Sequence, residues 1–166
     1  LDQVMEGANR PGHFKGVVRV VKRLFEIVRP DTAFFGLKDY QQFAIIQELV
    51  RQLNFPIELV GCDIIRETSG LAMSSRNTRL SETEIEQAKV LFQALNHLKG
   101  CVNANGIETC LHEAKEIIGE HAKLEYLQIA DKDLLQPVSN IAESPGARAF
   151  VAAHVGPVRL IDNLEL

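Results

Sequence analysis

Residues Gly36–Gln42 combine the residue types best suited to binding a phosphorylated ligand. The segment falls where a short apolar stretch gives way to a helical pattern, and open α/β sheets bind ligands outside the carboxyl ends of their strands. Gly36 lets a ligand approach the backbone closely, and the start of the following helix favours anions. The amine of Lys38 can follow a phosphate through a reaction, Asp39 can accept hydrogen bonds from ribose hydroxyls, and Gln42 can bind a polar substrate. The alternative is an ordinary strand-to-helix turn with a solvated lysine and a capping aspartate.

A second polar segment, Met73–Asn77, supplies two hydroxyls and a guanidinium. Ser74, Ser75 and Arg76 can surround a polyphosphate from several sides. This segment and Gly36–Gln42 both follow predicted strands, and the ends of neighbouring parallel strands converge on one crevice. We therefore predict that the two segments face each other across a nucleotide. The alternative is a flexible loop whose hydroxyls meet water.

The turn Arg10–Phe14 is a third candidate. Pro11 and Gly12 favour a fixed turn, which leaves Arg10 and His13 free to face a pocket. The alternative is that these two side chains cap a helix or make surface contacts.

The remaining histidines and the cysteines are interpreted as structural. No metal site is predicted, because no ligand spacing links the other four histidines, His97, His112, His121 and His154. Three cysteines without CxxC spacing are predicted to be reduced and unligated thiols of a cytosolic protein: Cys62, Cys101 and Cys110.

The first third of the chain alternates between helical and strand patterns. Helices are predicted over 14–28 and 39–53, and short apolar strands over 32–35 and 56–60. Short connections in this order predict parallel strands, so the fold class is α/β. These elements are interpreted as the closing units of a doubly wound sheet whose other strands lie upstream.

A second unit of α+β character follows. Ser81 and Glu84 match a capping box that opens a helix to about Leu98, with Gly100 as its stop. A helix over 107–118 comes next, then strands over 124–129, 148–154 and 158–161, the last two joined as a hairpin. The predicted division is 1–62 for the end of the parallel-sheet domain, 63–80 for a linker with the phosphate-binding loop, and 81–166 for the C-terminal domain.

Composition excludes some classes of function. The formal net charge is -4, which leaves no electrostatic footprint for nucleic acid. No apolar run is long enough to span a membrane and no signal peptide is visible, so a cytoplasmic protein without nucleic-acid or membrane partners is expected. The chain does not begin with Met, and we expect it to be a fragment.

Three ordered motifs resemble the pantothenate synthetase family, the pantoate–β-alanine ligases: Arg10–Phe14, Phe35–Gln42 and Arg66–Asn77. The resemblance implies a Rossmann-like nucleotidyltransferase fold and ATP-dependent condensation of pantoate with β-alanine through a pantoyl adenylate, releasing AMP and pyrophosphate. It also implies Mg²⁺ with the nucleotide and a homodimeric full-length enzyme. The segment 1–62 would then end an ATP-binding domain.

The resemblance implies a role for each matched position. Gly36 and Asp39 would contact the ribose, and Leu37 between them would also belong to the ATP-binding residues. The phosphates and the charge moving onto pyrophosphate would be held by Lys38, Ser74, Ser75 and Arg76. Ile65 and Met73 would lie near the adenine. Pantoate would be bound by Gln42, with Arg10 and His13 lining the acyl side of its pocket.

The sequence departs from the family pattern twice. Leu37 replaces a residue that is commonly Glu, and the HxGH-type motif with the acid-base histidine is absent. This chain is therefore expected to be inactive alone. Two alternatives remain: a related adenylate-forming ligase that uses a different acid, and a nucleotide-binding or interaction module without catalysis.

Overall fold

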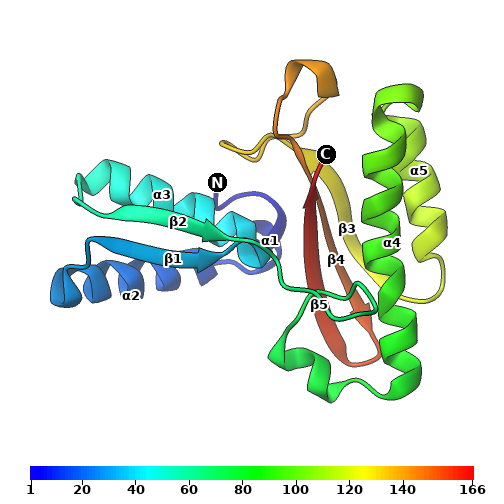
Figure 1. The fold of residues 1–166 in the computed structure, drawn as a ribbon, viewed down its shortest axis with the longest axis horizontal. Helices are drawn as coiled ribbons and strands as arrows, with labels where there is room; N and C mark the ends of the chain where they lie inside the picture. The colour runs from blue at the N-terminus through cyan, green and yellow to red at the C-terminus, as the bar shows by residue number, and fades with distance from the viewer. The chain divides into compact units, whose positions relative to one another are not determined.

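The computed structural model describes residues 1–166, which form two compact units (Figure 1). The first unit comprises Leu1–Asp63 with Asp133–Leu135, and the second comprises Ile64–Lys132 with Gln136–Leu166. None of the helices combines the length and the apolar character needed to cross a bilayer.

The first unit is built from helices and two parallel strands. In chain order its elements are α1 (Met5–Asn9), α2 (His13–Val28), β1 (Thr32–Gly36), the 3₁₀ helix η1 (Leu37–Asp39), α3 (Tyr40–Leu53) and β2 (Glu58–Cys62). The strands β1 and β2 pair in parallel from Thr32 opposite Glu58 to Gly36 opposite Cys62. The predicted α/β class and helix–strand order are confirmed, although the second strand begins two residues later than the pattern indicated.

Alternation along β1 decides which face of this small sheet is covered. Ala33 and Phe35 pack against a core formed by Phe25 of α2 with Ile46 and Leu49 of α3. Phe34, between them in sequence, points to the other face, because successive strand residues alternate. Its side chain is 69% exposed.

The second unit joins two long helices to an antiparallel sheet. Its elements are η2 (Ser75–Arg79), α4 (Glu82–Asn105), α5 (Ile107–Ile118), β3 (Lys123–Ala130), η3 (Ile141–Glu143), β4 (Arg148–Val155) and β5 (Val158–Glu165). The strand order is β3-β4-β5, with both pairs antiparallel. The predicted hairpin of the last two strands is confirmed, and β5 runs four residues further than expected.

The helix α4 continues past Gly100, where the sequence predicted its end. It stops at Asn105, before Gly106, whose φ of 81° lies in the left-handed region. A glycine inside a helix costs about 1 kcal/mol relative to alanine. Val102, one turn after Leu98, is buried in the same core as Leu95 and Leu98. This packing outweighs the cost of the glycine.

The prediction of three unpaired cysteines is wrong for two of them. Cys101 of α4 and Cys110 of α5 form a disulfide, with their Cα atoms 6.1 Å apart, whereas Cys62 is free and exposed. The two paired residues lie on different helices of a hairpin. Sequence spacing alone therefore could not indicate their distance.

The capping box at the start of α4 is present as predicted. The Ser81 hydroxyl accepts from the backbone N–H of Glu84, and the Glu84 carboxylate accepts from the Ser81 N–H at 2.8 Å. The Ser81 hydroxyl also donates to the Glu84 carboxylate at 2.9 Å. The bond from the Ser81 backbone N–H, and second the bond from its hydroxyl, lower the pKa of Glu84 below its ordinary value.

Ser81→Ala should lower the free energy of unfolding by about 1 kcal/mol, as is usual for loss of an N-cap. The pKa of Glu84 is lower in the folded than in the unfolded protein. Its contribution to the free energy of unfolding is therefore complete above the unfolded-state pKa and is lost as the pH falls through the folded-state pKa. The deficit of the variant should therefore shrink in acid. Urea denaturation at neutral and acidic pH measures it, with Thr83→Ala in the same turn as control; equal midpoints for both variants would show that the cap is redundant.

Candidate functional site

The segment Gly36–Gln42 leads from the last residue of β1 through η1 into the first turn of α3. Gly36 ends the strand in extended conformation, and a Cβ added to it would meet nothing within 4 Å, so this point is open to a close-approaching group. Asp39 is the N-cap residue of α3 but makes no side-chain cap hydrogen bond. The alternative of a capping aspartate is therefore wrong, and its carboxylate is not used by the helix.

Lys38 and Asp39 extend from η1 with different exposures. The side chain of Lys38 is 22% exposed and that of Asp39 is 54% exposed, and Lys38 Nζ lies 4.0 Å from Asp39 Oδ2. Such a long contact is a weak restraint on either side chain. Leu37 instead lies over the backbone of β2, because a Cβ on Gly61 would come within 2.6 Å of Leu37 Cδ2. An apolar residue at position 37 thus covers a glycine.

The two glutamines that follow have different surroundings. Gln41 is buried and fastens the N-terminal turn: its Nε2 donates to the carbonyls of Leu1 and Val4, and its Oε1 accepts from the N–H of Glu6 at 3.0 Å. The half-buried amide of Gln42 makes no hydrogen bond in the structure. Gln42, the predicted substrate ligand, therefore keeps its full hydrogen-bonding capacity.

Arg10 and His13 flank the turn before α2. Arg10 pairs with Glu6 at 3.6 Å, so part of its charge is already balanced. The pKa of His13 is lowered, first by burial and then by the Arg10 charge, and the carboxylates of Glu6 and Asp39 oppose this. The electrostatic influence of Asp39 on His13 connects this turn with the start of α3.

In the second unit the predicted phosphate loop is preceded by a tight hairpin. Its arms are joined by the bridge between Arg66 and Ala72, and Gly70 turns the chain with a φ of 88°. A side chain on Gly70 would meet the ring of Phe92 at 2.4 Å, so a residue without Cβ is needed there.

Arg66 anchors this hairpin. Its guanidinium donates to both oxygens of Asp162, at 2.6 and 3.0 Å, and to the carbonyls of Gly70 and Asn163. It also lies 4.0 Å from the centroid of the Phe92 ring. The hairpin is thereby held to β5 and α4 within the second unit.

Ser74, Ser75 and Arg76 begin the 3₁₀ helix η2. The Ser74 hydroxyl accepts from the backbone N–H of Arg76 as an N-cap, and Arg76 donates to the carbonyl of Arg159 at 3.3 Å. The exposed Ser75 hydroxyl has no partner. The segment is a 3₁₀ helix and not an irregular stretch, while the exposed Ser75 hydroxyl faces solvent as the alternative expected.

Ile65 and Met73 form an exposed apolar pair on the hairpin. The N–H of Met73 donates to the carbonyl of Ile65 at 2.9 Å, which brings the two residues side by side across the arms. Their exposures are 71% and 54%. Two neighbouring apolar side chains left in solvent suit the face of a planar ring such as adenine.

The predicted site residues thus fall into two groups. Those gathered in the first unit are Arg10, His13, Gly36, Leu37, Lys38, Asp39 and Gln42. Those gathered in the second unit are Ile65, Met73, Ser74, Ser75 and Arg76. That the two groups enclose one nucleotide stays a prediction.

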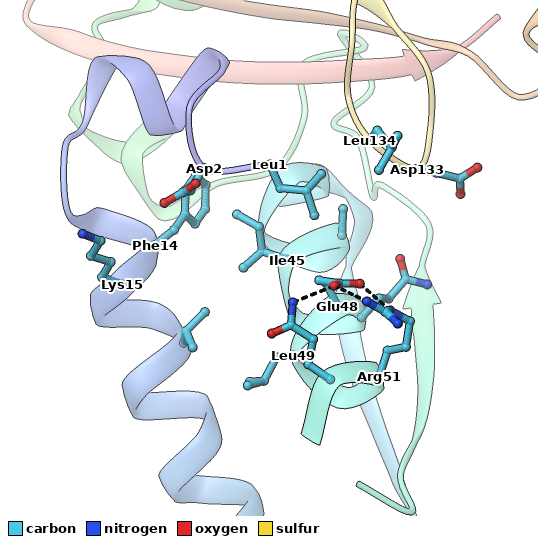
Figure 2. Close-up of a pocket in the computed structure, with 14 residues that line it drawn as sticks. Leu1, Asp2, Phe14, Lys15, Ile45, Glu48, Leu49, Arg51, Asp133 and Leu134 are labelled. Carbon is cyan, nitrogen blue, oxygen red and sulfur yellow. Dashed lines mark hydrogen bonds and ion pairs between the residues drawn. The ribbon is translucent and has the colours of Figure 1, made fainter. Parts of the chain in front are cut away.

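One hollow of the first unit is lined by none of the predicted site residues. It has a volume of about 900 Å³ and runs between α2, α3 and the N-terminal residues (Figure 2). Phe14 and Ile45 line it, and Glu48 on its wall is bonded to Arg51 and Gln52. Because helix surfaces rather than strand ends form its walls, it is not the hollow expected for a nucleotide in an α/β sheet.

Three residues that shape these segments were missed by sequence reasoning. Gln41 had only its position beside Gln42 as a signal. Arg66 and Asp162 are 96 residues apart, so only the folded chain reveals their pairing.

Known proteins are similar to this chain over its whole length. The sequence profile of the family described as Pantoate-beta-alanine ligase matches residues 1–165. Pantothenate synthetase from Cytophaga hutchinsonii is 45% identical over 170 residues, covering all of this chain and 60% of that protein. The pantothenate synthetase from Bacteroides fragilis is also 45% identical and is covered to 59%.

Solved structures agree. Pantothenate synthetase from Thermus thermophilus superposes with a TM-score of 0.94 at 42% identity, covering 99% of this chain and 60% of that one. Pantoate-beta-alanine ligase from Francisella tularensis, complexed with β-γ ATP and β-alanine, gives a TM-score of 0.72 at 34% identity and is covered to 54%.

Fold and comparisons together define an α/β protein that contains part of a doubly wound parallel sheet followed by an α+β domain. The chain belongs to the pantoate–β-alanine ligase family. It spans about 60% of the length of the relatives it matches.

Proposed function

We propose that this chain is the C-terminal part of an enzyme that condenses pantoate with β-alanine to give pantothenate, AMP and pyrophosphate, and that it supplies residues that bind the phosphates of ATP. The observation that carries the proposal is the family match over residues 1–165. A related enzyme of the same fold has been crystallised with β-γ ATP and β-alanine, which supports both as substrates here.

The reaction proceeds in two displacements. A carboxylate oxygen of pantoate attacks the α-phosphorus of ATP, the bond from that phosphorus to the bridging oxygen breaks, and pyrophosphate leaves. The amine of β-alanine then attacks the acyl carbon of pantoyl adenylate, AMP leaves, and the nitrogen loses a proton. The first step moves negative charge onto pyrophosphate, so cationic and N–H donors aimed at it stabilise the transition state.

Lys38 and the start of η2 supply those donors. The Lys38 ammonium lies 4.0 Å from the Asp39 carboxylate, at the end of β1 where a phosphate is expected to bind. Ser75 offers a hydroxyl without a partner, and the Arg76 guanidinium is exposed and ordered beside it. Together with Ser74 these groups would neutralise the leaving pyrophosphate.

Residues of both units would bind the sugar and the base. Gly36 leaves the backbone open, and the uncapped carboxylate of Asp39 can accept from ribose hydroxyls. The exposed pair Ile65 and Met73 suits the adenine face. Mg²⁺ would enter as part of the nucleotide, with phosphate oxygens as its ligands.

Pantoate would lie against the first unit. The half-buried Gln42 amide has no side-chain hydrogen-bond partner within the chain, so it can donate to hydroxyl or carboxylate oxygens of a substrate without losing a competing bond. Arg10 and His13 would face the acyl side. Burial lowers the pKa of His13, which favours its neutral form.

The organisation of the longer protein is proposed from the family. Residues 1–62 would end the ATP-binding domain, 63–80 would form the linker with the phosphate-binding loop, and 81–166 would be the C-terminal domain. The full-length enzyme would be a cytoplasmic homodimer.

The purified 166-residue chain should form no pantothenate, whereas the full-length enzyme that contains it should. The physical reason is that the HxGH-type motif, which the resemblance makes the second wall of the nucleotide site, is not among these residues. Phosphates open to water gain little from each charged contact, because the effective dielectric is high. Product formation from ATP, pantoate and β-alanine measures this.

Clear turnover by the short chain as a monomer would contradict the account of where the catalytic groups lie. ATP binding by the full-length protein without pyrophosphate release would favour a non-catalytic nucleotide-binding module. Turnover only with another acid would favour a related ligase.

A further inference from the structure

We propose that His97, Cys101 and Glu113 form a binding site for a divalent cation of the zinc type when the cysteines are reduced. The site lies in the second unit, between α4 and α5, and is separate from every residue assigned to the ligase reaction. The ligand atoms of the three side chains all lie within 4.8 Å of one another.

Two packed helices create this cluster. His97 and Cys101 are four residues apart on α4 and therefore share one face, and Glu113 on α5 meets that face. His97 Nε2 lies 2.7 Å from Glu113 Oε2. The histidine–glutamate hydrogen bond and the Cys101–Cys110 disulfide both cross between α4 and α5, and together they place the Cys101 sulfur within 4.8 Å of both other ligand atoms.

The three donors suit zinc. An imidazole nitrogen, a thiolate and a carboxylate oxygen are its usual ligands, and three protein ligands leave a fourth position for water. Bonds of about 2.0–2.3 Å in a tetrahedron place ligand atoms roughly 3.3–3.7 Å apart. The histidine and glutamate atoms must therefore move apart from 2.7 Å by at most about 1 Å, and a pair of ligand atoms as far apart as 4.8 Å must close by about 1 Å. His97 and Glu113 are partly exposed, at 32% and 38%, which leaves them room to move and gives the ion a path.

The disulfide and the metal site exclude each other. In the structure Cys101 is bonded to Cys110, and a disulfide sulfur is not the thiolate that binds a metal. A dithiol reductant delivers two electrons and two protons, which yields two thiols and the disulfide of the reductant. The ion then binds the Cys101 sulfur as its thiol proton is released. The hairpin of α4 and α5 is thus held by a disulfide when oxidised and by a cation when reduced.

Cobalt(II) provides the first test, because its visible spectrum reports tetrahedral geometry and its near-ultraviolet band reports a bound thiolate. The full 166-residue chain with Cys62→Ser, which removes the exposed free thiol, is titrated after reduction. One cobalt per chain should bind with both signals, and zinc should displace it. Cys101→Ser should abolish the thiolate band, and His97→Asn or Glu113→Gln should weaken binding about tenfold or more.

Two variants separate the site from chance binding. His112→Asn alters an exposed histidine that lies 3.5 Å from Glu116 and is not part of the cluster, and it should change nothing. Cys110→Ala cannot form the disulfide but keeps all three ligands, so it should bind cobalt without any reductant. Absence of binding in both the reduced protein and Cys110→Ala, or binding that survives Cys101→Ser, would overturn the proposal.

Discussion

Replacing Lys38 with alanine in the full-length enzyme should lower kcat by roughly 10²–10³, the range for losing one preorganised electrostatic donor. In the proposed mechanism the ammonium would act mainly when charge develops on the leaving pyrophosphate. The KM for ATP should therefore change much less than kcat. Steady-state kinetics of pantothenate formation separates the two parameters.

Lys15→Ala is the matched control, since Lys15 is an exposed lysine of the same unit without an ion pair. It should leave kcat unchanged. A loss below about threefold for Lys38→Ala, comparable with the control, would make Lys38 a solvated surface residue and would remove the main cation from the proposed site.

Asp162→Ala should lower the free energy of unfolding by about 3 kcal/mol, at the lower end of the range for breaking a buried ion pair. Asp162 is 4% exposed, and its loss leaves the Arg66 guanidinium with two carbonyls and a ring but no countercharge. The lower end applies because Arg66 remains 17% exposed. The hairpin that carries Ile65 and Met73 should also lose its anchor.

Glu86→Ala provides the comparison, because it breaks an ion pair with Lys89 on the surface of α4. A pair in which one partner is 70% exposed should be worth less than about 1 kcal/mol. Urea denaturation of both variants gives the difference. Equal losses would show that the Arg66–Asp162 pair is no more important than a surface contact.

Local pattern was enough to predict much of the fold. The helix from His13 to Val28 carries its apolar residues at helical spacing, and the Ser81–Glu84 capping box marks the start of α4 to the residue. These features depend on neighbours in sequence, which is why they can be recognised without a structure. The end of α4 could not, because burial of Val102 outweighs the breaking effect of Gly100.

The residues of the proposed site could be named from the sequence, but the contacts that hold them in place could not. Lys38 and Ser74–Arg76 were proposed as site residues because their types and order resemble those of a family. Contacts that depend on distant residues left no such trace, among them the Arg66–Asp162 pair and the Cys101–Cys110 disulfide. The cluster of His97 with Glu113 escaped for the same reason, since its members come from two helices.

The central claim is that Lys38 and the Ser74–Arg76 segment serve an adenylation of pantoate. It is tested most directly by exchange of labelled pyrophosphate into ATP, catalysed by the full-length enzyme. Exchange should require pantoate and should proceed without β-alanine, because adenylation precedes and does not need the amine. Exchange that appears only when β-alanine is added, or none at all with pantoate, would contradict a pantoyl-adenylate intermediate and the roles assigned to these residues.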